Sequence, residues 1–265
     1  MEFRDILYST DDSVARITLN KPDKLNALSW GTWAEIETAI EAANEDDDVR
    51  CVLLTGAGRG FSSGTDLTAA PDEANGPSRP FHGRLEAMRT RFLGAATVHD
   101  CRKPTVAAVN GVCVGAGFSL ALACDIRIAS EVAQFSAIFV KRGISADTGT
   151  TWFLPRLIGM ERALEMLYTG RMVGAEEAVR IGLASEAIPA DQLEARVTEL
   201  ASTIAHGPSL AVELNKRLAR EGMSRSLAEH IEVEQFLQGV THGSEDAAEG
   251  RLSFMEKREP VFRGR

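Results

Sequence analysis

Cysteine is scarce in this sequence, and so is any signal for export. The four cysteines, Cys51, Cys101, Cys113 and Cys124, form no C-x-x-C pair, so we expect buried thiols rather than zinc ligands or disulfides. No metal site is therefore predicted. The first twelve residues carry acidic side chains where a signal peptide would need a basic start and a long apolar stretch. Both absences favour a cytoplasmic protein.

Positive charge is also in short supply. The chain has 29 Lys and Arg against 38 Asp and Glu, a formal net charge of −9, whereas a nucleic-acid site needs a concentrated basic surface. Residues 104–124 carry no charge, but Asn110-Gly111 and two further glycines interrupt this run with turn residues. We therefore expect a buried strand there and no membrane span, and we expect small molecules or proteins as partners.

The remaining pattern is that of an α/β chain which, at 265 residues, is long enough for one large domain or a domain with an appendage. Strands are predicted over 14–19, 51–56, 105–109 and 125–130, with loops and helices between them. Ser29 can cap a helix whose apolar positions 33, 36, 40 and 43 share one face. A connection over 71–84 and a helix over 85–98 follow. From Glu161 the pattern is almost wholly helical, up to a final helix that ends before Pro260.

Two glycine-rich loops, 56–67 and 111–120, each follow a buried strand and lead toward a helix. The first lacks the G-K-[ST] of a Walker loop, and the second lacks the third glycine of a dinucleotide fingerprint. The first also contains G-F-S-S-G, which would make Ser62 a nucleophile, but it does not directly follow the strand and no histidine stands out as its base. The loops could be simple tight turns. Together they could instead direct two unpaired backbone N–H groups into one cleft, as an oxyanion hole does.

These loop sequences resemble those of a known family. GAGRGFSSGTDL is similar to the first loop of the crotonase (enoyl-CoA hydratase/isomerase) superfamily, and KPTVAAVNGVCVGAGFSLALACDIRIAS is similar to the second. NKPDKLNAL, TGRMVGAEEAVRIGLAS and FMEKREPVF agree as well, so the resemblance covers almost the whole chain.

The resemblance implies an α/β spiral of ββα turns, the ClpP/crotonase-like fold. Residues 1–200 would form the core with the acyl-CoA site, and residues 201–265 a C-terminal helical trimerisation region. The implied substrate is an acyl-CoA thioester, with no separate cofactor, and the implied assembly is a homotrimer or a dimer of trimers. Carried over by position, the oxyanion donors are the backbone N–H groups of Ser63 and Ala116. The substrate-binding residues would be Lys24, Leu25, Ala27, Ser63, Gly64, Thr65, Asp66, Leu67, Gly115, Ala116, Ser119 and Phe139, with Lys257 of a neighbouring subunit reaching the CoA phosphates.

The chain departs from the hydratases of this family at both glutamates that hold and activate water. Their positions are Ser119 and Phe139, neither of which can exchange a proton near neutral pH. Asp147, in GISADTGTTWFLPRLIG, resembles instead the acid of ring-epoxide isomerases that act on phenylacetyl-CoA derivatives, and of dienoyl-CoA isomerases and a CoA-dependent dehalogenase. The resemblance thus implies an isomerase with Asp147 as proton shuttle. Apolar surface from Ile138, Phe139 and Trp152 would raise its pKa.

Alternatives stay open at this point. Asp147 could cap a helix beginning near Thr148, which would hold its carboxylate ionised. On the same scaffold the activity could be that of a hydratase, lyase or hydrolase. A catalytically silent acyl-CoA-binding subunit is an alternative of another class.

Four other polar side chains receive secondary roles. Asp66 is expected to stabilise its loop or to contact CoA, and Asp125 to begin a strand. His82 and His99 have no partner signature and are expected to be structural or surface residues.

Overall fold

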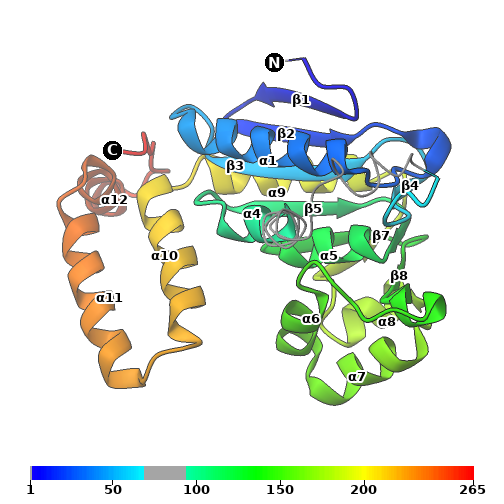
Figure 1. The fold of residues 1–265 in the computed structure, drawn as a ribbon. Helices are drawn as coiled ribbons and strands as arrows, with labels where there is room; N and C mark the ends of the chain where they lie inside the picture. The colour runs from blue at the N-terminus through cyan, green and yellow to red at the C-terminus, as the bar shows by residue number, and fades with distance from the viewer. Residues whose placement is uncertain (1, 69–93) are drawn as a thin grey trace, which may run out of the picture.

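The computed structural model describes residues 2–68 and 94–265, and a six-stranded sheet lies at its centre (Figure 1). β1 is antiparallel to β2, and the other neighbouring strands are parallel. The strand predictions over 14–19, 51–56, 105–109 and 125–130 are confirmed, because each matches a strand to within one residue. In spatial order the strands are β1 (Ile6–Asp11), β2 (Val14–Leu19), β3 (Cys51–Gly56), β5 (Thr105–Val109), β7 (Ile126–Ser130) and β10 (Glu186–Ile188).

A second sheet of four very short strands lies beside the first. It contains β4 (Gly60–Ser62), β6 (Val112–Val114), β8 (Gln134–Ser136) and β9 (Val173–Gly174). The chain passes from a strand of the large sheet to a strand of the small sheet and then to a helix: β5, β6 and α5 (Ala116–Ala123) form one such turn. Successive turns pair in parallel, as Cys113 does with Phe135. This is the α/β spiral of ββα turns that the sequence predicts, and the glycine loops lie at the small-sheet crossings.

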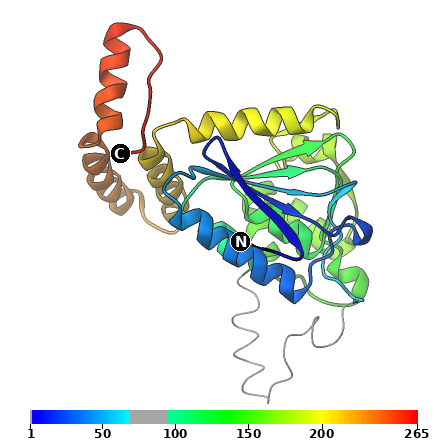
Figure 2. The ribbon, with the colours of Figure 1, turned by 90° about the horizontal axis from the view of Figure 1, so that it is seen from above.

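Helices cover both faces of the large sheet. Figure 2 shows α1 (Trp30–Glu45) and α9 (Leu193–Ala205) on opposite sides of it. Val197 and Ala201 of α9 pack in one apolar cluster with Leu53 of β3 and with strands β5 and β7. At the start of α1, the Ser29 hydroxyl accepts a hydrogen bond from Thr32 N–H (3.2 Å), so the predicted cap is confirmed.

Further short helices connect the strands of the core. They are η1 (Pro22–Lys24), α4 (Gly94–Asp100), η2 (Ile138–Arg142), α6 (Thr150–Ile158), α7 (Met160–Thr169) and α8 (Ala175–Arg180). α4 overlaps the end of the helix predicted over 85–98. The rest of that helix, the connection predicted over 71–84, and His82 lie outside the described residues.

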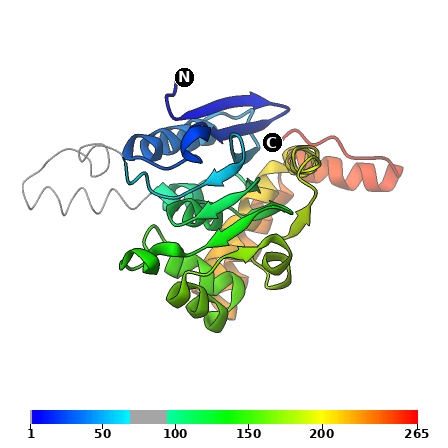
Figure 3. The same cartoon turned by 90° about the vertical axis from the view of Figure 1, so that its right-hand side faces the viewer.

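Three consecutive helices extend to one side of the core (Figures 1 and 2), and in the view of Figure 3 the orange part of them lies behind the core. We call α10 (Ser209–Gly222), α11 (Leu227–His242) and α12 (Glu245–Glu256) the helical arm. The predicted boundary at residue 201 falls inside α9, which covers the sheet, so the arm begins after that helix. Asp125, just before β7, holds α10 through Lys216 Nζ (2.8 Å) and Arg220 Nη2 (2.6 Å).

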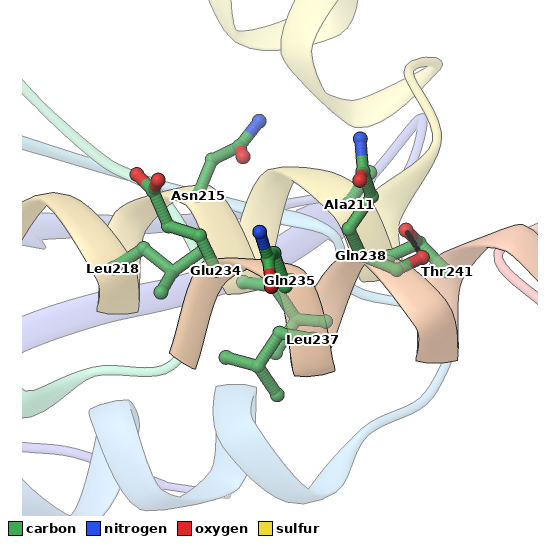
Figure 4. A pocket seen from close by; sticks show the side chains of 9 residues that line it. Ala211, Asn215, Leu218, Glu234, Gln235, Leu237, Gln238 and Thr241 are labelled. Carbon is green, nitrogen blue, oxygen red and sulfur yellow. Dashed lines mark hydrogen bonds between the residues drawn. The ribbon is translucent and has the colours of Figure 1, made fainter. Parts of the chain in front are cut away.

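A groove of about 390 Å³ runs between α10 and α11 (Figure 4). Large apolar side chains are also exposed on the arm, among them Leu227, Phe236 and Phe254. The groove is lined only by arm residues: Ala211, Leu214, Asn215, Leu218, Glu234, Gln235, Leu237, Gln238 and Thr241.

Within the described ranges, no helix is long and apolar enough to cross a membrane.

The chain that follows α12 turns back along the arm and reaches the core. Arg50, beside β3, donates a hydrogen bond from Nη2 to the carbonyl of Arg263 (2.7 Å). The buried carboxylate of Asp246, in the first turn of α12, accepts from the N–H groups of Arg263 (2.7 Å) and Gly264 (2.8 Å). The arm is thus attached at its beginning through Asp125 and at its end through Arg50.

Candidate active site

Three loops meet where the two sheets adjoin. Leu28 N–H donates to Gly64 O (2.7 Å), and Asp66 N–H donates to Leu28 O (2.9 Å), which makes a parallel bridge between Leu28 and Thr65. Leu25, earlier in the same loop, has a left-handed backbone (φ 49°). The first glycine loop is therefore fixed from one side by residues 25–28.

The two glycine loops touch through their backbones. A Cβ on Gly64 would lie 2.9 Å from Val114 O and 3.4 Å from Ala116 N, and the φ of +91° disfavours any side chain there. A Cβ on Gly117 would lie 2.4 Å from the Cβ of Ser62. Only glycine permits this approach, and it brings the start of α5 against residues 62–65.

Ala116 provides a backbone donor at this contact. It is the first residue of α5, after the N-cap Gly115, so its N–H has no acceptor within the helix. No residue in the described part of the chain accepts a hydrogen bond from it. The Ala116 N–H can therefore donate to an oxygen atom of a ligand, as an oxyanion donor would.

Ser63 is different, and the structure corrects its predicted role as the other donor. Its N–H already donates to Leu25 O (2.8 Å), and its hydroxyl donates to Lys24 O (3.0 Å). In the parallel bridge, Leu28 forms its hydrogen bonds with Gly64 and Asp66, the two neighbours of Thr65. The N–H of Thr65 itself therefore points away from Leu28. Among the described residues, none accepts from Thr65 N–H.

Asp66 anchors the loop that carries Thr65. Its carboxylate, almost wholly buried, accepts from Thr68 N–H (3.0 Å), the Thr68 hydroxyl (2.7 Å) and Lys24 Nζ (2.9 Å). Burial raises its pKa, but the hydrogen bonds from Thr68 and Lys24 outweigh that effect and lower the pKa to about 2. Asp66 is thus held ionised, as suits the loop-stabilising role expected of it.

Neither position of the missing glutamates carries a proton-exchanging group. Ser119 is fully buried in α5, where its hydroxyl contacts Gly115 O (3.3 Å) and the hydroxyl of Thr150. Phe139 is buried in η2. Ile138, next to it, lies against the second loop, since a Cβ on Gly115 would be 3.5 Å from its Cγ2.

Asp147 is half-buried and lies just before α6. Gly149, not Asp147, is the N-cap residue of that helix, and it is the carbonyl of Asp147 that accepts from Thr150 N–H (3.1 Å). The Thr148 hydroxyl donates to the Asp147 carboxylate (3.2 Å). Thr148 has a φ of 49°, a strained conformation for a β-branched residue, and such strain clusters at functional sites.

An apolar pocket of about 230 Å³ is lined in part by Thr148 and Gly149, which directly follow Asp147 in the chain. The ring of His99 lies 5.2 Å from those of Trp152 and Phe153, and the guanidinium of Arg156 covers Trp152 at 4.0 Å. Burial lowers the pKa of His99, and nearby Arg220 and Lys216 lower it further, which favours the neutral ring. The pocket is lined by Ala96, His99, Thr148, Gly149, Trp152 and Phe153.

Sequence reasoning missed this role of His99. Its ring partners lie more than fifty residues further along the chain, so no local pattern connects them. The sequence itself shows only that His99 follows the helix predicted over 85–98.

The structure gives no chemical role to several other residues that the sequence offers as nucleophiles or metal ligands. The Ser62 hydroxyl is fully buried and donates to Asn26 O (2.8 Å), so it is not a nucleophile poised for attack. All four cysteines are buried free thiols, and burial raises the pKa of Cys51 and Cys124 to about 12. The described residues hold no cluster of three or more His, Cys, Asp or Glu suited to a metal ion.

Lys257 lies far from these loops in its own chain. It follows α12, and α12 and β4 are at opposite sides of the molecule in Figure 1. Any contact with CoA would therefore have to be made in another subunit.

Comparison with known proteins identifies the family. Residues 9–265 match the family model described as enoyl-CoA hydratase/isomerase. The chain is 34% identical to the crotonyl-CoA hydratase of Syntrophomonas wolfei, over 99% of both chains, and 34% identical to the 1,2-epoxyphenylacetyl-CoA isomerase of Escherichia coli, over 100% of both. The crystal structure of an enoyl-CoA hydratase from Bacillus anthracis superposes with a TM-score of 0.90 at 33% identity, covering 99% of this chain and 100% of that one. The chain therefore belongs to the enoyl-CoA hydratase/isomerase family.

Proposed function

We propose that this protein is an acyl-CoA isomerase that moves a double bond, or opens an epoxide ring, in a CoA thioester. One observation carries the proposal. Of the carboxylates on the loops of the site, Asp66 is held ionised by Thr68 and Lys24, and both glutamate positions are occupied by buried Ser119 and Phe139. Asp147 is the carboxylate that these loops leave for proton transfer.

The backbone donors supply the electrostatic part of the reaction. Removing a proton beside the thioester carbonyl places negative charge on its oxygen. The N–H groups of Ala116 and Thr65 face this charge in the proposal, with Thr65 in place of Ser63 because Ser63 N–H is bonded to Leu25. Two preorganised donors in a site that excludes water stabilise such an oxyanion by several kcal/mol.

Asp147 then carries the proton. It takes a proton from one carbon of the acyl chain and returns it to another while the oxyanion donors hold the dienolate. No water takes part, which is consistent with the absence of a second acid or base at positions 119 and 139. Hydration would need both groups, and for that reason we place it second although the crotonyl-CoA hydratase is a near relative.

The apolar pocket that Thr148 and Gly149 help to line is proposed to hold the distal end of the acyl group. Its volume of about 230 Å³ exceeds the roughly 150 Å³ of an apolar cavity that accommodates benzene. Aromatic walls favour a flat ring through edge-to-face contacts. The E. coli relative, named for an epoxide of phenylacetyl-CoA, supports a ring-bearing acyl group.

The CoA portion is proposed to lie along residues 24–27 and 63–67, with Lys257 of a neighbouring subunit at its phosphates. The exposed apolar side chains of the helical arm support a homotrimer or a dimer of trimers, because apolar surface of this kind is normally buried between subunits.

A substrate screen with matched variants tests the proposal. Purified protein is given 2-enoyl, 3-enoyl and ring-epoxide CoA esters, and exchange of the acyl α-proton is followed in heavy water. Asp147→Asn should lower turnover at least about 100-fold while the affinity for acetyl-CoA stays unchanged. Asp191→Asn, on an exposed turn, is the matched control and should behave as the parent.

The alternatives give different results in the same screen. Hydration of a 2-enoyl ester that survives Asp147→Asn would assign a hydratase and refute the isomerase. Release of free CoA would assign a hydrolase. Tight binding of acyl-CoA without exchange in any ester would show a binding subunit.

A further inference from the structure

Two buried hydroxyls connect the second glycine loop to the segment of Asp147. Ser119 in α5 and Thr150 at the start of α6 are both fully buried. Ser119 Oγ lies 3.3 Å from Gly115 O and 2.5 Å from Thr150 Oγ1, and Thr150 Oγ1 lies 3.0 Å from Asp147 O. The hydroxyls therefore form a chain between two backbone carbonyls.

This chain has fewer protons than contacts. Two hydroxyls supply two protons for three oxygen–oxygen contacts. Either Ser119 donates to Gly115 O and Thr150 to Ser119, or Thr150 donates to Asp147 O and Ser119 to Thr150. The backbone N–H groups of Ser119 (3.0 Å) and Thr150 (3.1 Å) also donate to Gly115 O and Asp147 O, respectively. The chain can therefore reverse its direction without leaving a buried carbonyl unpaired.

The carbonyl of Gly115 belongs to the same peptide unit as the N–H of Ala116. That unit is planar and rigid, so a hydrogen bond to its oxygen fixes the direction of its N–H. Hydrogen bonds in series also polarise one another in a medium of low dielectric constant. When negative charge gathers at Ala116 N–H, Gly115 O becomes a stronger acceptor, which favours the arrangement in which Ser119 donates to it.

We infer that Ser119 and Thr150 are positioning residues, which strengthen the Ala116 donor as charge develops and hold the Asp147 segment at a fixed distance from it. The inference rests on the proposed oxyanion site. Because the stabilisation grows with the charge on the ligand oxygen, it acts on the transition state more than on the bound substrate. The turnover rate should therefore change, and the affinity should not.

The test compares Ser119→Ala, Thr150→Val, Thr150→Ser and the double variant Ser119→Ala with Thr150→Val. Three quantities are measured: the saturated rate of α-proton exchange, the dissociation constant of acetyl-CoA, and the infrared stretching frequency of the bound thioester carbonyl. Each single loss of a hydroxyl should slow exchange about tenfold, the factor that one buried hydrogen bond typically contributes. It should also reduce the downshift of the carbonyl frequency and leave the dissociation constant within about twofold. Thr150→Ser keeps its hydroxyl and should remain near the parent.

The double variant should be no slower than either single variant, because one chain of hydrogen bonds is broken in all three. Ser253→Ala is the matched control, since that hydroxyl is also buried and lies 3.2 Å from a carbonyl of its own helix, α12. A parental rate and carbonyl frequency in Ser119→Ala, or a loss in Thr150→Ser equal to that in Thr150→Val, would overturn the inference.

Failure of the proposed reaction gives a separate signature. In one outcome the parent exchanges no proton but binds acetyl-CoA with a carbonyl downshift that Ser119→Ala reduces. That result would refute the proposed isomerase activity and support the positioning role of Ser119. If acetyl-CoA binds without any downshift in the parent, or does not bind, the oxyanion site itself is refuted and the positioning role falls with it.

Discussion

Asp66 allows a direct measurement of how firmly the first glycine loop is held. Its side chain is only 6% exposed, and it accepts two hydrogen bonds from Thr68 and one from Lys24. These bonds outweigh the effect of burial and lower its pKa from the ordinary 3.8 to about 2. At about 1.4 kcal/mol for each tenfold change in acidity, the ionised carboxylate contributes about 2 kcal/mol to the stability of the folded chain.

The sign of the pH dependence follows from this shift. The pKa of Asp66 is lower in the folded chain than in the unfolded one, so its contribution is fully present above about pH 5 and is lost as the pH falls through 3.8 toward 2. The free energy of unfolding of Asp66→Asn should therefore be about 2 kcal/mol lower than that of the parent at pH 7. Between pH 5 and pH 3 the difference should shrink, because the parent alone loses this contribution.

Urea unfolding followed by tryptophan fluorescence measures this difference at pH 7, 5, 4 and 3. The protein concentration is kept fixed, since association would otherwise add to the apparent stability. Thr68→Val should remove more of the stability than Lys24→Met, because Lys24 is 52% exposed and its charge is screened by water. A difference between parent and Asp66→Asn that stays constant from pH 7 to pH 3, or a greater loss in Lys24→Met, would refute this reasoning.

Three further changes test other parts of the structure. Gly64→Ala should cost about 2 kcal/mol in urea unfolding and abolish α-proton exchange, because its φ of +91° and the contact with Val114 O leave no room for a methyl group; an active, equally stable variant would contradict this. Trp152→Ala should weaken phenylacetyl-CoA binding about tenfold in calorimetry and leave acetyl-CoA binding unchanged, and an equal loss for both ligands would place the acyl group elsewhere. Lys216→Met should cost about 2 kcal/mol and speed amide exchange over 209–222, because it removes a buried partner of Asp125; unaltered exchange would show that Arg220 alone holds α10.

The parts of the fold that could be predicted are those with local signals. The uninterrupted apolar run of β5 and the hydroxyl of Ser29 before α1 are both visible within a few residues. β4, β6 and β8 have three residues each and are held by pairing with one another across more than twenty residues of chain. They therefore look like loop in the sequence. β1 was also missed, because only one of its six residues is buried and its pattern does not alternate.

The candidate site shows the same limit at the level of single residues. Asp147 is a candidate because its whole segment resembles that of ring-epoxide isomerases. The choice between Ser63 and Thr65 depends on which residue bridges Leu28, and that register is set by contacts between loops distant in the sequence. For the same reason nothing in the sequence indicates that the hydroxyls of Ser119 and Thr150 meet.

The returning tail makes the last residues part of the folded unit. Because Asp246 and Arg50 bind the backbone at 262–264, cutting away these few residues would deprive the buried Asp246 carboxylate of two donors and remove the contact between the tail and Arg50 of the core. A purification tag fused after residue 265 would lie beside this attachment, whereas one placed ahead of residue 2 would not. Expression vectors for crystallisation or binding work should therefore carry the tag at the amino end.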